Sequence, residues 1–249
     1  MSMEDREIEL LYDSTIFEKD LASCGIQLTR GQVRQFQDYY DMLVETNKVM
    51  NLTGITEYHE VMKKHFVDSV LLSRVVNIKN IHRVMDIGTG AGFPGIPLKI
   101  VYPHLKVVLL DSLNKRIGFL GQVVDKLGLR DVTLVHGRAE DYARDVKYRQ
   151  QFDLCVSRAV ANLALLSEYC IPYVKKSGRF VAYKSGDIEE EVAAARKAVE
   201  VLGGKIEQEE MFQLPYTDIS RSFVVIGKVK DTPRIYPRKA GIPKKDPII

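Results

Sequence analysis

The stretch VMDIGTGAGFPGIP, residues 84–97, places one carboxylate and a cluster of glycines where a strand is expected to end. Asp86 is followed by four closely spaced glycines, Gly88, Gly90, Gly92 and Gly95. The last three have the spacing G-x-G-x-x-G, which lets a backbone turn tightly and approach a nucleotide or an adenosyl group. The pattern therefore predicts a cofactor site, although glycines needed only to pack a strand tightly on a helix would give it too.

Two acids decide which cofactor we expect. Asp86 lies just before the first glycine, and Asp111 ends the next apolar segment, about 20 residues further on, which by itself would also be typical of a dinucleotide site. A pyrophosphate binds best to helix N-terminal N–H groups with no acid nearby, whereas S-adenosyl-L-methionine carries an ammonium and a sulfonium group. We therefore expect S-adenosyl-L-methionine, with Asp86 facing its positive charge and Asp111 accepting the ribose hydroxyls.

The segment VTLVHGRAEDY, residues 132–142, supplies a third strand end. Ala139 and Glu140 follow this strand directly, and ligands of open parallel sheets lie over the carboxyl ends of the strands. Backbone groups of these two residues are expected to border the adenine. The alternative is an ordinary helix N-terminus with acids in its first turn.

The fourth expected strand ends in CVSRAVANL, residues 155–163, and this ending argues against several methyl acceptors. It lacks the prolines that enzymes methylating the amino group of adenine need there. Cys155 and Cys170 are expected in the core, not as nucleophiles for methylation of pyrimidine C5. No Lys or His base is placed at the strand end. An acceptor with an exposed lone pair, such as guanine N7, needs only positioning and desolvation.

Four basic residues are expected at the same rim of the sheet, where they could hold phosphate groups of a nucleic acid: Lys115, Arg158, Lys184 and Arg221. Each could instead be a solvated charge or a partner of a helix end. Arg158 and Lys184 directly end apolar strands, a position where a merely solvated surface charge is less expected.

The elements that must position these residues alternate along the chain from residue 81. The strand candidates are Arg83–Ile87, Lys106–Leu110, Val132–Val135, Phe152–Ser157, Gly178–Lys184, Lys205–Gln213 and Ser222–Lys228. Helical stretches separate the early strands, which indicates a doubly wound parallel sheet, while a short loop joins the last two as an antiparallel hairpin. The predicted fold class is α/β, a class I S-adenosylmethionine-dependent methyltransferase: a Rossmann-like seven-stranded sheet with the last strand antiparallel.

Two further segments flank this predicted core of residues 81–230. Residues 1–80 are expected to form a helical extension, in which Thr29 and Gln32 make a capping box that starts a helix at Arg30. A second helix is expected over His59–Val76. Residues 231–249 form a basic tail with four prolines, for which we expect an extended chain without regular structure.

Composition narrows the class of protein. The chain has 249 residues, of which 45% are hydrophobic and 28% charged, as in globular proteins with a sizeable core, and its net charge of +3 is too small to identify a polyanionic partner. Three distant cysteines without a CxxC pair favour neither disulfides nor a zinc site, and we expect no metal. Without a signal peptide or an apolar run of about 20 residues, we expect a cytoplasmic monomer that does not use a membrane.

The motifs together resemble those of the RsmG (GidB) family, which methylates guanosine N7 in bacterial small-subunit (16S) ribosomal RNA. The segments DIGTGAGFPGIPLKI, DSLNKRIGFL, GRAED, SRAVANL, YKSG and YPRKAGIPKK carry the resemblance, and NKVMNLTGIT and HFVDSVLL extend it over nearly the whole chain. The resemblance implies a methyltransferase that needs no general base. The alternatives are a methyltransferase of another RNA or of a small molecule on the same core, or a dinucleotide-dependent oxidoreductase.

The resemblance also implies roles for individual residues. Cofactor contacts are implied at Gly88, Phe93, Ala139, Glu140 and Arg158, and active-site or RNA contacts at Lys115, Arg158, Lys184 and Arg221. The N-terminal helices and the basic tail, with Arg238 and Lys239, are implied to face the RNA. Asn51, His65 and Asp68 are family motif positions as well, but Asn51 could be a turn or cap, and His65 and Asp68 could be a local pair one helical turn apart.

Overall fold

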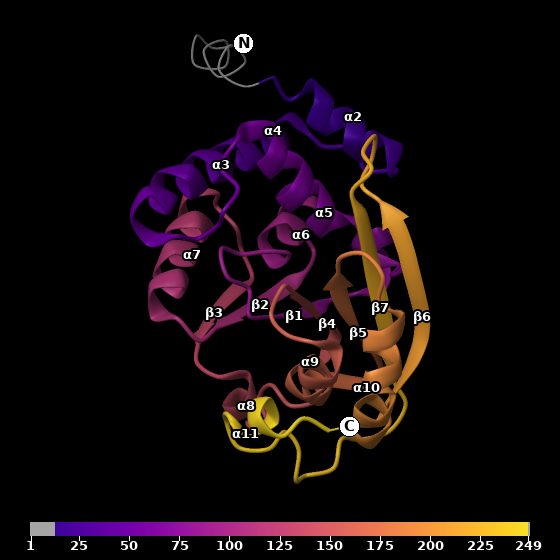
Figure 1. Cartoon of the computed structure of the whole chain (residues 1–249). Coiled ribbons are helices and arrows are strands. Elements are labelled where there is room, and N and C mark those ends of the chain that lie inside the picture. The colour runs from indigo at the N-terminus through magenta and orange to yellow at the C-terminus, as the bar shows by residue number, and fades with distance from the viewer. Residues whose placement is uncertain (1–12, 249) are drawn as a thin grey trace.

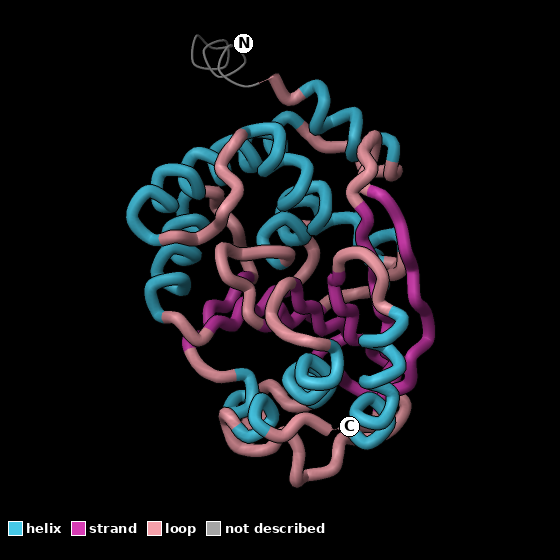
Figure 2. Tube along the Cα trace, viewed as in Figure 1, coloured by secondary structure: helices cyan, strands magenta, loops and turns pink. Residues whose placement is uncertain are grey.

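A seven-stranded sheet lies between two layers of helices in the computed structural model, which describes residues 13–248 (Figures 1 and 2). The strands are β1 Arg83–Ile87, β2 Lys106–Asp111, β3 Val132–His136, β4 Phe152–Arg158, β5 Val174–Lys184, β6 Gly204–Gln213 and β7 Ser220–Lys228. Their order is β3-β2-β1-β4-β5-β7-β6, and β7 is antiparallel to both of its neighbours. The predicted fold class is therefore confirmed.

The helices divide between the two faces of the sheet, as Figure 1 shows. One face carries α2 Thr15–Ser23, α3 Arg30–Met50, α4 Tyr58–Val61, α5 Asp68–Val70, α6 Gly95–Val101 and α7 Asn114–Lys126. The other face carries α8 Ala139–Tyr142, α9 Leu163–Cys170, α10 Glu189–Val201 and α11 Ile242–Lys245. Each layer has its own core cluster, and the N-terminal helices share one with the sheet. The N-terminal segment is thus packed as part of the same body.

The predicted capping box starts α3. Gln32 donates its backbone N–H to Thr29 Oγ1 over 3.2 Å, and Thr29 donates its own to Gln32 Oε1 over 2.9 Å. The same Gln32 side chain donates to the carbonyl of Ile100 on α6 over 2.8 Å. Phe36 and Leu43 lie on the buried face of this helix. One residue therefore both caps the start of the helix and ties it to the helix that follows the glycines.

The helix expected over His59–Val76 is not a uniform α-helix. After α4, residues Met62–Val67 form π-helical turns, α5 continues them, and a 3₁₀ turn, Leu71–Arg74, ends the segment. A π turn inserts an extra residue into the helical register and often occurs at functional sites. Here it carries Lys64 and His65.

The tail was predicted to lack regular structure, and this prediction is wrong in part, because Ile242–Lys245 form the short helix α11. The tail is also docked. Arg149 donates to the carbonyls of Thr232 and Tyr236, each over 2.8 Å, and Arg238 pairs with the buried Glu168. Prolines lack a backbone N–H group but keep the carbonyl, and the side chain of Arg149 donates to three carbonyls of the tail, the third being that of Pro233.

Candidate active site

Residues 88–95, the glycine loop, join β1 to α6 and have the backbone shape that the sequence predicts. Gly88, Gly90 and Gly92 have φ values of 68°, 62° and 105°, in the left-handed region that favours glycine. A Cβ atom on Gly92 would lie 2.5 Å from the hydroxyl of Tyr39, which donates to the carbonyl of Ala91. Tyr39 of the N-terminal helix α3 therefore packs against the loop and supports it.

Asp86 holds the glycine loop from inside. Its side chain is completely buried, and its Oδ2 accepts from Thr89 Oγ1 and from the backbone N–H of Gly95, each over 2.8 Å. Burial raises the pKa of this carboxyl to about 7. Its other oxygen, Oδ1, is buried without a hydrogen-bond partner among the described residues, so the contact of Asp86 with a cationic ligand stays a prediction.

Asp111 ties the glycine loop to the next strand end. One oxygen accepts from the backbone N–H of Gly90 over 2.9 Å and from Arg116 over 3.3 Å, and the other accepts from that of Leu113 over 2.9 Å. A carboxylate has about four acceptor positions, so contact with ribose hydroxyls stays a prediction. The loop and the acid do lie together, as their positions at neighbouring strand ends predict.

Ala139 and Glu140 start α8 at the same edge of the sheet, next to β3. Both are buried, and the carbonyl of Ala139 accepts from the hydroxyl of Tyr173 over 2.6 Å. Glu140 Oε1 accepts the backbone N–H of Gly241 over 3.1 Å, so the docked tail reaches this end of the site. Their contact with adenine is untested and stays a prediction.

A pocket of about 620 Å³ opens beside the glycine loop and brings together three of the four basic residues predicted for the active site, Arg158, Lys184 and Arg221. The charged side chains and the histidine of its lining are Lys64, His65, Asp68, Arg158, Lys184, Glu191 and Arg221. Arg158 and Lys184 end β4 and β5, whose carboxyl ends lie side by side in register. Arg221 reaches the same rim because Lys184 pairs with Ser222 on the antiparallel β7.

Asp68 links the two arginines of the pocket. Its Oδ2 lies 3.0 Å from Arg158 Nη1, and its Oδ1 lies 3.2 Å from Arg221 Nε. The carboxylate is buried, whereas both guanidinium groups reach the pocket surface in part. Charge-assisted bonds of this kind fix direction as well as distance, so one acid sets how two cations face the pocket.

Arg158 also lies over an aromatic stack that rises from the glycine loop. Its guanidinium carbon is 5.0 Å from the ring centroid of Phe93, and the ring of His65 stacks on Phe93 with centroids 4.7 Å apart. Phe93 is buried, so the structure gives it a supporting role; its implied cofactor contact is untested. The stack connects the predicted cofactor loop to the basic pocket.

His65 does not pair with Asp68, contrary to the local pair considered from their spacing. Its Nε2 lies 2.8 Å from Thr53 Oγ1, and its Nδ1 lies 3.4 Å from Arg158 Nη2. Burial, followed by the charge of Arg158, lowers the pKa of His65 to about 3. The imidazole is therefore neutral at physiological pH, and both it and Asp68 contact Arg158.

Lys184 is held by two protein groups at once. Its ammonium donates to the carbonyl of Ala161 over 2.7 Å and to Glu191 Oε1 over 2.6 Å. Glu191 is a pocket residue that the sequence did not reveal. It belongs to a run of three glutamates at the start of α10, where acids are expected simply because they favour a helix N-terminus.

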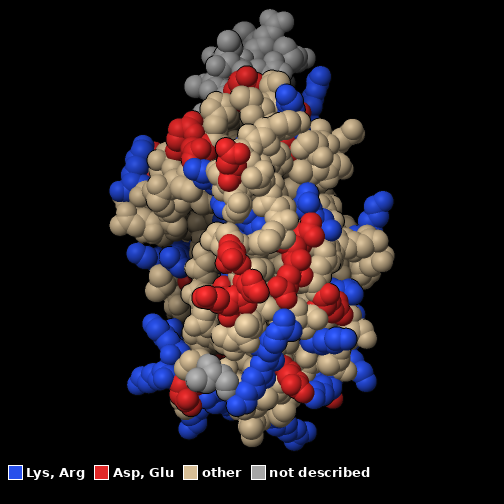
Figure 3. Space-filling model, turned by 45° about the vertical axis from the view of Figure 1, so that its right-hand side comes forward, with Lys and Arg blue, Asp and Glu red and all other residues tan. Residues whose placement is uncertain are grey.

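The remaining predicted residues lie outside this pocket. Lys115 is exposed in the first turn of α7, and Lys239 is exposed in the tail, while Arg238 uses its guanidinium on Glu168 and Asp246. Asn51 is the C-cap of α3 with φ of 50°, which agrees with its interpretation as a cap. In Figure 3, acidic side chains gather across the middle of one face and basic ones below them, so this face is not uniformly basic.

Comparison with known proteins identifies the family. Residues 32–219 match the family model described as GidB, rRNA small subunit methyltransferase G. The chain belongs to this family. A relative named ribosomal RNA small subunit methyltransferase G from Lachnoclostridium phytofermentans is 53% identical over 237 residues, or 95% of this chain and 98% of the relative. One of the same name from Brevibacillus brevis is 50% identical, covering 94% and 98%. The resemblance seen in the motifs is thus confirmed.

Solved structures support the fold. The M. jannaschii protein TYW2 in complex with AdoMet matches with a TM-score of 0.53 at 15% identity, covering 71% of this chain and 80% of that one. A point mutant of MtNAS in complex with S-adenosylmethionine gives a TM-score of 0.53 at 16% identity, covering 89% and 80%. At such low identity these matches speak for the fold alone.

Residues 13–248 also bear on membrane spans and metal sites. No helix in this part of the chain is both long and apolar enough to cross a membrane. Within the same residues, no three His, Cys, Asp or Glu side chains gather as metal ligands would. Cys155 and Cys170 are buried, as predicted.

Proposed function

We propose that this chain transfers a methyl group from S-adenosyl-L-methionine to N7 of a guanosine in small-subunit (16S) ribosomal RNA. Family membership and the names of its relatives support the class of enzyme and of RNA. The observation that favours N7 is the pocket around Arg158, where the histidine of the lining has its pKa lowered to about 3 and both carboxylates of the lining are paired with cations.

The choice of N7 depends on whether the acceptor atom must lose a proton during methylation. Guanine N7 has an in-plane lone pair and no proton, so its methylation requires no base. His65 is the one histidine of the pocket lining, and a group with a pKa of about 3 accepts protons poorly at pH 7. The two carboxylates of the lining are paired with cations, Asp68 with two arginines and Glu191 with Lys184. Acceptors that must lose a proton, such as an amino group or a hydroxyl, suit this lining less well.

The glycine loop and its neighbours are suited to the cofactor. A Cβ atom on Gly88 or Gly92 would collide with neighbouring side chains, and both glycines have the left-handed φ of a loop that can cradle a ligand. When bound, S-adenosyl-L-methionine supplies an electrophilic methyl group. The residues proposed to hold it are Gly88, Gly90, Gly92, Phe93, Asp111, Ala139, Glu140 and Arg158, with Asp86 keeping the loop in shape.

The basic side chains are proposed to hold the RNA. Arg158 and Arg221, oriented by Asp68, present positive charge at the pocket mouth, and Lys184 adds a third cation. Phosphate contacts of this kind fix the register of the RNA and exclude water from the reacting base. Lys115 and Lys239 extend the contact outward. An rRNA substrate favours a cytoplasmic enzyme, and a pocket lined by residues of one chain is compatible with a monomer.

Two measurements test this proposal. Calorimetry should show binding of S-adenosylhomocysteine and no binding of NAD. Small-subunit RNA from a strain lacking the modification should accept a labelled methyl group from S-adenosylmethionine. Failure to bind S-adenosylhomocysteine would overturn the cofactor, and absence of transfer to this RNA, naked or in subunits, would overturn the substrate.

A further inference from the structure

Residues 159–162, here called the β4 loop, join β4 to α9 and lie against the glycine loop. A Cβ atom on Gly88 would lie 2.5 Å from Cγ2 of Val160, so the two loops are in close contact. Ala159 has a φ of 55°, a left-handed conformation that is uncommon for a residue with a side chain. The surroundings must therefore hold the β4 loop in this shape.

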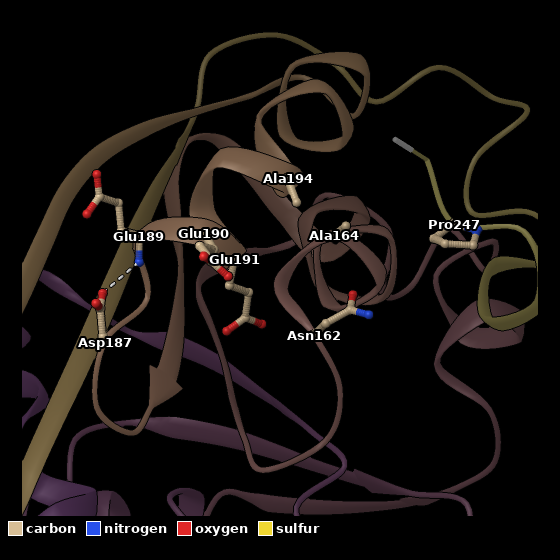
Figure 4. Close-up of a pocket in the computed structure, with 8 residues that line it drawn as sticks. All are labelled: Asn162, Ala164, Asp187, Glu189, Glu190, Glu191, Ala194 and Pro247. Atoms are coloured by element: carbon tan, nitrogen blue, oxygen red, sulfur yellow. Dashed lines mark hydrogen bonds between the residues drawn. The ribbon is translucent and has the colours of Figure 1, made fainter.

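Two side chains hold the β4 loop, Lys184 and Glu191, and one oxygen of Glu191 also accepts from Lys184. The carbonyl of Ala161 accepts from Lys184 Nζ over 2.7 Å. Just after the loop, the backbone N–H of Leu163 donates to Glu191 Oε1 over 2.5 Å, and the same oxygen accepts from Lys184 Nζ over 2.6 Å. In Figure 4 the side chain of Glu191 extends from the start of α10 toward the chain segment that carries Asn162.

The ammonium of Lys184 has one N–H donor left for a ligand. A lysine has three N–H donors, of which the β4 loop and Glu191 take two. The third is available to a phosphate at the pocket mouth. Because the side chain is only 12% exposed, its direction depends on these two partners. Glu191 thus acts on both the cation and the loop.

We infer that Glu191 is a positioning residue of the transferase site: it fixes the Lys184 ammonium and the β4 loop, and through that loop it sets the space over Gly88. The inference rests on the proposed function, since it assigns a role within the same site. This role can be distinguished by experiment from one in which Lys184 only contacts RNA phosphate. A lysine that only contacts RNA leaves cofactor affinity unchanged when it is replaced, whereas a loop anchor does not.

The test is the affinity for S-adenosylhomocysteine, measured by calorimetry without RNA. Glu191→Ala should weaken binding roughly fivefold to tenfold, the effect of losing a hydrogen bond that orders the site. Glu191→Gln keeps an oxygen acceptor for Leu163 and should stay within about twofold of the unaltered protein. The exposed neighbour Glu190, replaced by alanine, is the matched control and should bind normally. Lys184→Met should weaken binding as Glu191→Ala does.

The outcomes separate the two proposals. If Glu191→Ala and Lys184→Met both bind S-adenosylhomocysteine like the unaltered protein, the positioning role is overturned while the proposed function stands. The same holds if Glu190→Ala weakens binding equally. If the unaltered protein does not bind S-adenosylhomocysteine, the proposed function itself fails. Should Glu191→Ala not fold, Glu191→Gln and Lys184→Met still decide, because normal binding by Lys184→Met overturns the inference.

Discussion

Asp68 is the residue on which the geometry of the pocket depends most. It binds Arg158 with one oxygen and Arg221 with the other, so it orients guanidinium groups from two strands that lie far apart in sequence. The sequence suggested a contact with His65, because residues three apart are neighbours on a helix. The actual partners could not be predicted, since they depend on how the N-terminal helices dock on the sheet.

Replacing Asp68 by asparagine should impair transfer much more than cofactor binding. The neutral amide no longer balances two guanidinium charges, and methyl transfer to RNA should fall roughly tenfold to a hundredfold. Affinity for S-adenosylhomocysteine should change little. Steady-state transfer assays and calorimetry measure the two effects, with the exposed Asp125 on α7, replaced by asparagine, as control. Equal loss of cofactor affinity and transfer would contradict the role given to Asp68.

His65 should make stability depend on pH on the acidic side. Its pKa is about 3 in the folded protein and about 6.5 when unfolded, so between these values the unfolded chain binds more protons. The stabilising contribution is full above pH 6.5 and is lost as the pH falls, by up to about 1.4 kcal/mol per pH unit. Urea unfolding at several pH values should show this loss reduced in His65→Gln. Parallel pH profiles would show that His65 titrates normally.

At the scale of elements, the sequence predicted the shape of the glycine loop but not the side chains that hold it. Glycine spacing predicted the left-handed turns, since few other residues adopt them. The hydroxyl of Tyr39, 52 residues before the carbonyl of Ala91 that it contacts, closes the loop from α3. The sequence predicted only that a helix starts at Arg30, because contacts between distant elements leave no local pattern.

Gly92→Ala should therefore destabilise the protein and weaken cofactor binding. The added Cβ meets Tyr39, and the φ of 105° is unfavourable for alanine, so the free energy of unfolding should fall by about 2 kcal/mol or more. Gly118→Ala on α7 is the control, because its Cβ has no atom within 4 Å, and it should stabilise by about 0.5–1 kcal/mol. Similar melting temperatures for both variants would contradict this description of the loop.

The tail offers a matched pair of adjacent basic residues. Arg238 is bound to Glu168, which is only 1% exposed, whereas Lys239 is exposed. Arg238→Ala leaves a buried acid without its cation and should cost roughly 3–5 kcal/mol of unfolding free energy. Lys239→Ala should leave stability unchanged and make RNA binding less dependent on salt. Thermal unfolding and RNA titrations at several salt concentrations compare the two. The reverse pattern would return Arg238 to an RNA contact.

For the whole molecule, the sequence predicted the strands, their reversal at β7 and the rim where Arg158, Lys184 and Arg221 meet. These features follow from alternating apolar segments and from the fact that carboxyl ends of parallel strands share one edge. It did not predict that Asp86 lies under the loop or that the tail docks through Arg238. Such features depend on which charged groups become buried, and burial is decided by the packing of all layers together.

Methylation of guanine N7 without a base is best tested by locating the methyl group on the RNA. Unmodified small-subunit RNA should be incubated with the protein and labelled S-adenosylmethionine, then digested and its nucleosides separated. Label is expected in N7-methylguanosine, at one guanosine, and transfer should be lost in an Arg158→Ala variant that still folds. Label on an exocyclic amine, on a ribose hydroxyl or on pyrimidine C5 would contradict it.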